Sequence, residues 1–359
     1  MIRFILKRLY YGFLVLLGVI TIVFFLFNVL PGDPARMVLG QRADEASIKS
    51  INKDLGRDKP LYLQFCMYVN DLSPLSIHET NDTEHYLFLD DSKYKAAKLF
   101  SVGSSKVLVA KLPYLRRSYQ SKRMVTDIIF ETLPETAILA FVSMLFATII
   151  GVLIGIFSAL NKDSFFDNSS LVFAVLGMSA PSFFMGLIIA WIFGHLLSDY
   201  TGLNMVGSLY KMDDYGDGEY LELKNLILPA LTLGIQPLAI IIQLTRSSLL
   251  DVLSQDYIRT ARAKGLSFYK VIFKHALKNA LNPVVTAVSG FFASLMAGAV
   301  FVEWIFGWQG IGKEVVTALE KYDFPVVMGT VLVIASIFVL VNIIVDIIYG
   351  ILDPRIRVR

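Results

Sequence analysis

The sequence contains very little cysteine and histidine, the residues that redox chemistry and zinc sites use most. Its 359 residues include one cysteine, Cys66, and only four histidines. A single cysteine cannot form an internal disulfide, and no Cys/His spacing resembles a zinc site. The H-E-x-x-H and G-x-S-x-G signatures of metalloproteases and serine hydrolases are absent from the sequence as well. We therefore expect no catalytic residues and no metal site, so the chain is not expected to be an enzyme by itself.

Charged residues are also scarce, at 18% of the chain, whereas hydrophobic residues make up 55% and the mean hydropathy is +0.61. Soluble domains contain about 45 to 50% apolar residues, and a run of about 20 such residues can cross a bilayer as a helix. Six runs qualify, which predicts an all-α integral membrane protein with six transmembrane helices. The predicted spans lie near Leu9–Leu30, Thr132–Leu160, Leu171–Leu197, Leu226–Leu250, Val284–Trp304 and Val326–Ile351.

Local signals refine three of these spans. The sequence "TLPE" predicts that Thr132 caps the second span, with Pro134 in its first turn and Glu135 completing a capping box. Prolines in or beside the third and fourth spans remove backbone donors and predict kinked helices. These prolines are Pro181, Pro229 and Pro237.

The placement of Lys and Arg predicts the orientation. They gather at the N-terminus, between the fourth and fifth spans and at the C-terminus, so both ends are expected on the cytoplasmic side of the membrane. The loop before the second span exceeds the roughly 60 residues over which this rule applies, so it is free to be external. The predicted organisation is an anchor span at 1–30 that is too long for a signal peptide, an external loop at 31–130 with an insertion near 73–112, a core at 131–351 and a cytoplasmic tail at 352–359.

Two motifs suggest ligand binding and are set aside. "GWQGIGKE", Gly307 to Glu314, has the glycine and lysine spacing of a phosphate-binding loop, but no strand precedes it and a glutamate replaces the required Ser or Thr. A glycine-rich turn between spans is the favoured interpretation. "HETNDTEH", His78 to His85, has no recognised metal-ligand spacing, so we expect a solvated loop within a surface elaboration.

A basic segment joins the fourth and fifth predicted spans, from Asp256 to Pro283. Two to eight residues are enough for such a connection, yet about thirty are used. The pattern predicts two short helices with a bend at Gly265, where glycine offers a positive φ. A segment of this kind can lie on anionic headgroups or can dock on a cytoplasmic protein, and the charge alone leaves both open.

Motifs along most of the chain resemble the permeases of binding-protein-dependent ABC importers, specifically the dipeptide, oligopeptide and nickel branch. These motifs are "LPGDPA", "LGRDKPLYLQF", "SAPSFF", "LTRSSLLDVLSQDYIRTARAKG", "VEWIFGWQGIG", "DFPVV" and "VDIIYGILDPRIR". Arg259 and Lys278 depart from the general permease loop, which has an acidic residue and a proline there, and both departures resemble the peptide branch. The 73–112 segment has the character of an insertion in the first external loop.

The resemblance implies a role for the cytoplasmic loop 251–282 as a coupling helix that sits in a groove of an ATPase subunit. By resemblance, Ala261 allows a close helix approach, Gly265 makes the bend, and Leu266, Phe268 and Tyr269 are the apolar contacts. Arg259 and Arg262 would position the segment through charge, either against the ATPase or against lipid headgroups. The implied partners are a second permease subunit, identical or paralogous, two cytoplasmic ATPases and an external solute-binding protein, with no nucleic acid. ATP and magnesium would be bound by the ATPases, and this chain would hold no cofactor.

Polar residues within or near the spans are candidates for the translocation pathway, because an intramembrane charge is costly and is expected to face protein or water. They are Ser179, Ser182, Gln236, Gln243, Asn342 and Asp346. For Asp346 the alternative is hydration at the cytoplasmic interface.

The predicted function is that of a permease subunit that forms the pathway of an ATP-driven importer for peptides or related small solutes. Two alternatives are a secondary transporter, which needs an ion-coupling site but no ATPase, and a lipid-binding assembly protein. The sequence does not select the transported solute.

Overall fold

The computed structural model describes residues 2–29, 59–82, 85–90, 93–103, 105–213 and 218–352. Two compact units emerge, each described by itself. The first comprises residues 1–5, 132–313 and 337–359, and the second comprises residues 6–131 and 314–336. The predicted external loop up to residue 58 and the predicted tail beyond residue 352 lie largely outside the described residues.

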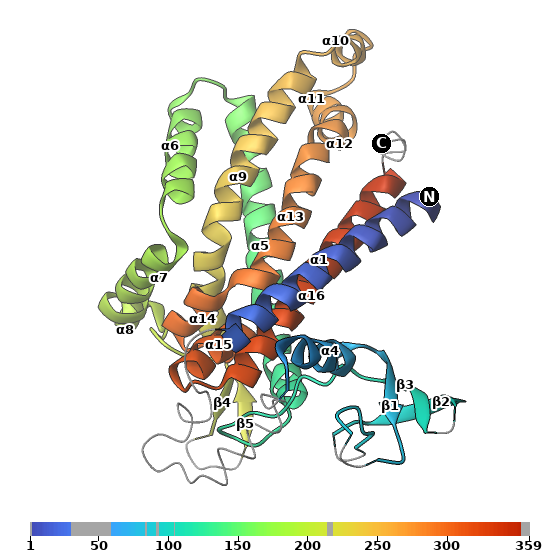
Figure 1. The fold of residues 1–359 in the computed structure, drawn as a ribbon. Coiled ribbons are helices and arrows are strands. Elements are labelled where there is room, and N and C mark those ends of the chain that lie inside the picture. Colours follow the sequence, from blue (N-terminus) through green and yellow to red (C-terminus); the bar gives the residue numbers. More distant parts are fainter. Residues whose placement is uncertain are drawn as a thin grey trace. The chain divides into compact units, whose positions relative to one another are not determined.

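Most of the first unit is helical (Figure 1). Its elements are α5 (Val125–Leu160, of which the part from Thr132 belongs here), α6 (Phe165–Ser179), α7 (Ser182–Trp191) with a π-helical turn (Ile192–Leu196), α8 (Ser198–Thr201), β4 (Tyr210–Met212), β5 (Glu219–Leu221), a 3-10 turn (Leu223–Leu226), α9 (Ile227–Leu253), α10 (Asp256–Ala263), α11 (Phe268–Lys270) with a π-helical turn (Val271–Ala276), α12 (Leu277–Ala280), α13 (Asn282–Gly298), α14 (Val300–Phe306), the start of α15 (Ile311–Glu320) and the second part of α16 (Phe324–Leu352).

Four helices are long and apolar enough to cross a membrane, in the regions Arg3–Phe27, Val125–Leu160, Leu223–Leu253 and Phe324–Ile347. Two bent helix pairs bring the number to six if each pair is one span. These pairs are Phe165–Ser179 with Ser182–Leu196, bent by 110°, and Phe268–Ala280 with Asn282–Met296, bent by 50°. The third predicted span corresponds to the first bent pair. The fifth predicted span corresponds only to the second helix of the other pair, because Phe268–Ala280 belongs to the predicted basic segment.

Three predicted details of the spans are wrong. Thr132 does not cap the second helix, which already begins at Val125 and contains Pro134. The third span is broken at Pro181 by far more than a kink, because helical structure stops at Ser179 and restarts at Ser182. The fifth predicted span ends at Gly298, and the residues up to Trp304 belong to a separate helix, α14.

Close packing of α5 against α9 builds the core of the first unit. A Cβ added at Gly155 would lie 2.6 Å from Cβ of Thr245, so only glycine permits this approach. Buried Met144 and Ala147 of α5 pack with Ile241 of α9 and with α13 in one apolar cluster. Because these helices interlock without space to spare, a shift of α9 must be transmitted to α5.

The glycine-rich stretch after α14 is a turn, as the sequence predicts. Gly307 adopts φ +67°, and α15 begins at Ile311. The backbone N–H groups of Gly312 and Lys313 donate to the buried carboxylate of Glu303, at 2.7 and 3.2 Å. The N-terminus of α15 is thus occupied by a side chain of the same chain, which excludes its use as a phosphate-binding loop.

The second unit contains α1 (Ile2–Val29), α4 (Leu61–Leu72) and a small sheet that the all-helical prediction did not include. The sheet has the order β1-β3-β2 and is antiparallel, with strands β1 (Leu75–Glu79), β2 (Ala96–Val102) and β3 (Lys106–Lys111). It forms the predicted insertion near 73–112. Val107 and Val109 alternate inward on β3 and pack with Leu89 in a buried cluster.

The predicted solvated loop at His78 to His85 is wrong for its first residues. His78 and Glu79 are buried on β1, and Asp82 and His85 follow in the connection, whereas residues 83 and 84 lie outside the described residues. Within the part of the chain that the structure describes, no group of His, Cys, Asp or Glu could hold a metal ion.

His78 makes the 73–112 sheet sensitive to pH. Its Nδ1 donates to the Leu87 carbonyl at 3.2 Å and its Nε2 accepts from the Ser76 hydroxyl at 3.0 Å. Burial, with the nearby Lys111 ammonium, lowers the pKa of His78 below its ordinary 6.5, although Asp71 opposes this. When the pH falls below 6.5, His78 takes up a proton in the unfolded segment more readily than in the folded sheet. The folding stability of the sheet, fully present above pH 6.5, is therefore lost as the pH falls toward the lowered pKa of His78.

We expect amide exchange in β1 and β3, corrected for intrinsic rates, to be faster at mildly acidic pH than at pH above neutrality. His78→Gln keeps a hydrogen-bonding side chain but removes the titration, so its exchange should not change with pH in this way. The same pH dependence in His78→Gln would assign the effect to another group.

Candidate functional site

The basic segment begins with α10, which is amphipathic. Gln255 caps it in an extended conformation, Asp256 lies in its first turn and Arg262 in its last, in the arrangement that the helix dipole favours. Ile258 and Ala261, three positions apart, are buried, while the charged residues face outward. One face of α10 is therefore fixed to the chain and the other is free.

A Schellman motif ends α10 at Gly265. The N–H of Gly265 donates to the Arg262 carbonyl at 2.9 Å, and the N–H of Leu266 donates to the Ala261 carbonyl at 3.4 Å. Gly265 has φ +77°, the left-handed conformation that this motif requires. No atom lies within 4 Å of a Cβ built there, so glycine is needed for its backbone angle and not for space.

The second helix runs from Phe268 to Ala280 and contains a π-helical turn at Val271–Ala276. Val271 and Ile272 point inward and are almost fully buried. Phe268 and Tyr269, at the start, are 54% and 73% exposed. Two large aromatic side chains in the first turn after the bend are thus presented away from the body of the chain.

The two short helices lie at one end of the first unit, beside the end of α9 (Figure 1), and a buried apolar cluster holds them there. It contains Ile156 and Ala159 from the end of α5, Leu249 from α9 and Ile258 from α10, together with inward residues of the second helix. Asn279 Nδ2 also donates to the Tyr257 hydroxyl at 2.9 Å and ties α12 to α10. The segment is therefore a rigid extension of two spans.

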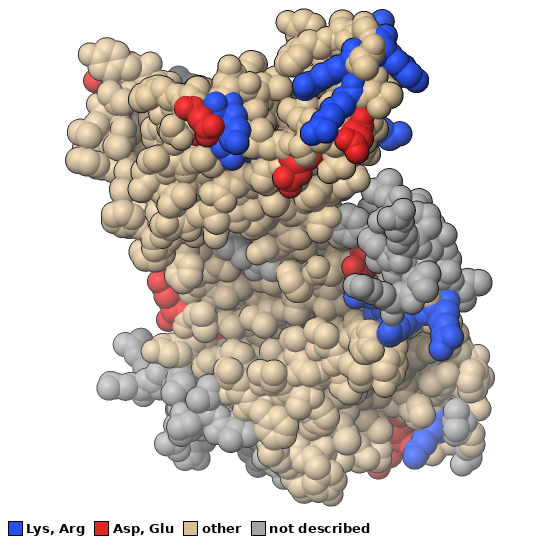
Figure 2. Space-filling view, turned by 90° about the horizontal axis from the view of Figure 1, so that it is seen from above, with Lys and Arg blue, Asp and Glu red and all other residues tan. Residues whose placement is uncertain are grey.

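Positive charge gathers on the outer side of this segment, in the view onto the end of the chain that carries α10 (Figure 2). Its basic residues are Arg259, Arg262, Lys264, Lys270, Lys274 and Lys278, all exposed. Arg259 forms an ion pair with Asp256 at 3.4 Å that is open to solvent and contributes little to stability.

The predicted coupling residues divide into an inner and an outer set. Ala261 does allow a close approach, but of α10 to the chain's own buried cluster, and Leu266 also packs half-buried against that cluster. Gly265 makes the predicted bend. Phe268 and Tyr269 remain available to a partner, together with the exposed residues Arg259 and Arg262.

Two outward aromatic residues were missed. Tyr257 on α10 is 42% exposed and Phe273 is 63% exposed. Phe273 follows Tyr269 by four positions, so helical periodicity places both on one face and provided the signal. The outer surface of the segment is therefore more aromatic than the three predicted contacts suggested.

A buried ion pair lies near this end of the first unit and was also missed. Arg246 of α9 donates to Asp167 of α6 from Nε at 2.5 Å and from Nη2 at 2.6 Å. The Asp167 side chain is fully buried and also accepts from Ser158 of α5 and from the Asp163 backbone. This pair fixes α6 to α9 one turn from Leu249, which packs in the buried cluster beneath the basic segment.

The six predicted pathway residues do not form one network through their described hydrogen bonds. Ser179 and Ser182 are exposed on either side of the break at Pro181, and the Ser179 hydroxyl donates to its own helix at Val175. Gln236 and Gln243, two turns apart on α9, are exposed and half-buried. On α16, Asn342 and Asp346 are half-buried, and Asn342 donates to the carbonyl of Phe338 in the same helix.

Bent apolar spans with a rigid, basic, aromatic-tipped segment at one end define the membrane component of a transport system. The chain belongs to the family described as binding-protein-dependent transport system inner membrane component, whose model matches residues 151–358, and the corresponding N-terminal model matches residues 1–85. It is therefore the permease subunit of an ABC importer in the inner membrane. It is a transport subunit and not an enzyme.

Curated relatives match over nearly the whole chain. A dipeptide transport system permease protein of Alkalihalophilus pseudofirmus is 35% identical and covers 99% of this chain and 100% of the relative. A di/tripeptide permease of Pseudomonas aeruginosa is 36% identical, covering 99% of both, and a glutathione transport system permease of Escherichia coli is 34% identical, covering 100% of both.

Among solved structures, the inward-facing MetNI methionine ABC transporter is similar in fold. The match has a TM-score of 0.50 at 19% identity and covers 64% of this chain and 97% of the other.

Proposed function

We propose that this chain forms the translocation pathway of an ATP-driven importer for peptides or related small solutes, and that residues 256–282 dock on a cytoplasmic ATPase. Family membership implies an external binding protein and ATPase partners. The peptide substrate is supported by the relatives named for dipeptide, di/tripeptide and glutathione transport. The complex would contain a second permease chain and two ATPases, which would bind ATP and magnesium, while this chain would hold no cofactor.

The exposed pair Phe268 and Tyr269 carries the docking proposal. Aromatic side chains anchored on a rigid element make good interface centres, because their ordering costs little entropy on binding. The buried cluster behind them reaches α5 and α9, so a force on the pair moves two spans together. A segment that only adsorbed to lipid would not require this rigid fastening.

Purification of the full chain in mild detergent should retain an ATPase in a fixed ratio. Phe268→Ala combined with Tyr269→Ala should lower that ratio at least about tenfold, since interface aromatics often contribute 2 kcal/mol or more. Tyr200→Ala is the control, because Tyr200 is an aromatic residue on α8 that is even more exposed, at 89%, and lies outside the basic segment. An unchanged ratio in the double variant would remove the segment as the docking site and leave the family membership intact.

The positive charge on α10 to α12 supports a cytoplasmic location for the segment and for both termini. In a Cys66→Ser background, cysteines replacing Glu219 on β5 and Lys264 after α10 should react with an impermeant thiol reagent from opposite sides of the membrane. Both positions are exposed. Labelling of both from one side would contradict the six-span topology.

The six polar residues on α6, α7, α9 and α16 are proposed to line the pathway. The break at Pro181 supports this for Ser179 and Ser182, because non-helical backbone within a membrane is stable only where protein or a water-filled cavity receives its polar groups.

Identification of the ligand that co-purifies with the binding protein would test the peptide assignment directly.

A further inference from the structure

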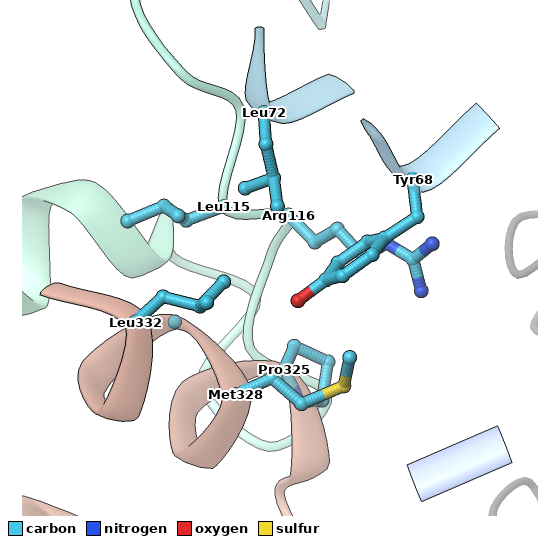
Figure 3. A pocket seen from close by; sticks show the side chains of 8 residues that line it. Tyr68, Leu72, Leu115, Arg116, Pro325, Met328 and Leu332 are labelled. Atoms are coloured by element: carbon cyan, nitrogen blue, oxygen red, sulfur yellow. The ribbon is translucent and has the colours of Figure 1, made fainter. Parts of the chain in front are cut away.

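A groove in the second unit is lined by side chains from three parts of the chain (Figure 3). Tyr68 and Leu72 come from α4, Leu115 and Arg116 from the connection before α5, and the rest from the start of α16. The residues from α16 are Pro325, Met328, Gly329 and Leu332. The groove encloses about 210 Å³ of atom-free space, its open mouth included.

Tyr68 places a hydrogen-bond donor at the bottom of this groove. The residue is only 4% exposed, and its hydroxyl, which points into the groove in Figure 3, has no hydrogen-bond partner among the described residues. Burial raises the pKa of Tyr68 well above its ordinary value, so the hydroxyl keeps its proton at neutral pH. A buried O–H without an acceptor is unfavourable, which indicates that an acceptor from another molecule belongs there.

Water is a poor candidate for that acceptor. Beneath its mouth the whole groove has room for only about one water molecule, and a buried water needs two to four polar partners. The polar side chains among its lining residues are Tyr68 and Arg116, and both present N–H or O–H donors, so neither offers a strong acceptor to the hydrogens of a water molecule. Leu72, Leu115, Met328 and Leu332 make the other walls apolar. A ligand that carries an acceptor oxygen on an apolar chain satisfies both the hydroxyl and the walls.

Arg116 adds a positive charge beside the groove. Its guanidinium lies 5.5 Å from the centre of the Tyr68 ring. Its backbone has φ +69°, a conformation that residues other than glycine seldom adopt. The charge favours a ligand that is anionic near its acceptor oxygen.

The surroundings of the groove are those of a membrane boundary. Four of its residues lie in the first three turns of α16, at the beginning of a membrane-crossing helix. Phe24 of α1 packs on Tyr68, with ring centres 5.7 Å apart, and neighbouring Ile22 and Phe25 are exposed. Apolar side chains exposed on a membrane-crossing helix face acyl chains.

We propose that this groove is a specific phospholipid site. The Tyr68 hydroxyl donates to an ester or phosphate oxygen of the lipid, and the Arg116 guanidinium pairs with its phosphate. The first carbons of an acyl chain cover the apolar walls. The site lies outside the coupling segment and does not depend on the identity of the transported solute. Its ligand class is an anionic glycerophospholipid.

The test begins with the full chain reconstituted in bilayers of equal parts phosphatidylglycerol and phosphatidylcholine and then released into mild detergent. Native mass spectrometry should show that the released chain retains phosphatidylglycerol. Tyr68→Phe removes only the oxygen and should lower this retention about fivefold, as the loss of one hydrogen bond predicts. Tyr62→Phe, on the same helix but 71% exposed, is the matched control and should retain lipid normally. Arg116→Gln should abolish the preference for phosphatidylglycerol over phosphatidylcholine.

A phosphatidylglycerol with a photoreactive acyl chain should label the peptide that contains Met328, and excess inorganic phosphate should not reduce this labelling. Unfolding temperatures equal to that of the unmodified chain would show that Tyr68→Phe is folded. Equal retention in Tyr68→Phe and the unmodified chain, or labelling only elsewhere, would overturn the site. Displacement of the lipid by inorganic phosphate would overturn the lipid assignment in favour of a free anion.

Discussion

Replacing Gly265 by valine is expected to abolish ATP-driven uptake while the permease remains inserted in the membrane. The Schellman motif needs φ near +77° at this position, and a left-handed conformation costs a side-chain-bearing residue roughly 1–2 kcal/mol, most for a β-branched one. That cost is enough to lower the population of the correct bend about tenfold. The second helix would then present Phe268 and Tyr269 in the wrong direction. Uptake by vesicles that contain the complete transporter is the measurement.

Gly265→Asn is the matched control, because asparagine tolerates positive φ far better than valine does. Since no atom lies within 4 Å of a Cβ at this position, neither variant meets a steric obstacle within the chain. The asparagine variant should therefore keep most of the uptake. Equal loss in both variants would mean that a partner approaches Gly265 closely, so that space and not backbone angle is what glycine provides.

Lys270→Glu separates docking from adsorption to lipid. Lys270 is exposed, and a reversed charge harms a helix that lies on anionic headgroups more than one held by aromatic packing. Normal uptake by Gly265→Val together with defective uptake by Lys270→Glu would contradict the docking assignment and support the lipid-surface alternative.

The features that the sequence predicted well are those that local chemistry decides. The bend at Gly265 follows from a glycine between two helical patterns. The membrane-crossing helices follow from apolar length alone. By contrast, the burial of Ala261 and Leu266 depends on where α5 and α9 end in space, which local periodicity does not contain. The sequence therefore did not show that Leu266, one of the three predicted partner contacts, packs half-buried against the chain itself.

Two further differences have separate physical reasons. Pro181 indicates that the third predicted span is interrupted. The size of the bend, 110°, is not predictable from the proline, because it depends on the packing of α7 on α9 and α14. The strand β3, with the alternating sequence "KVLVAK", carried a recognisable β signal that composition-based reasoning about a surface elaboration overlooked. The pairing of Asp167 with Arg246 joins residues 79 positions apart, and no short pattern indicates it.

The ion pair of Asp167 and Arg246 is expected to contribute strongly to the stability of the chain. Arg246→Met is expected to lower the free energy of unfolding by about 3–5 kcal/mol, because the Asp167 carboxylate would remain buried without its cation. Asp167→Asn should cost less than Arg246→Met, because the Arg246 side chain is 18% exposed and its guanidinium keeps contact with water. The double variant should lose clearly less than the sum of the two single losses, since neither charge is then left unpaired.

The exposed pair Asp256 and Arg259 in the same chain provides the control, and Arg259→Met should cause no measurable loss in the same unfolding assay in mild detergent. Arg246 lies one turn before Leu249, whose side chain packs beneath the basic segment. We therefore also expect Arg246→Met to impair uptake, and the double variant to recover part of that uptake. Strictly additive losses of stability would show that Asp167 and Arg246 act independently. In that case the fastening of α6 to α9 would have to come from the apolar contacts between these helices.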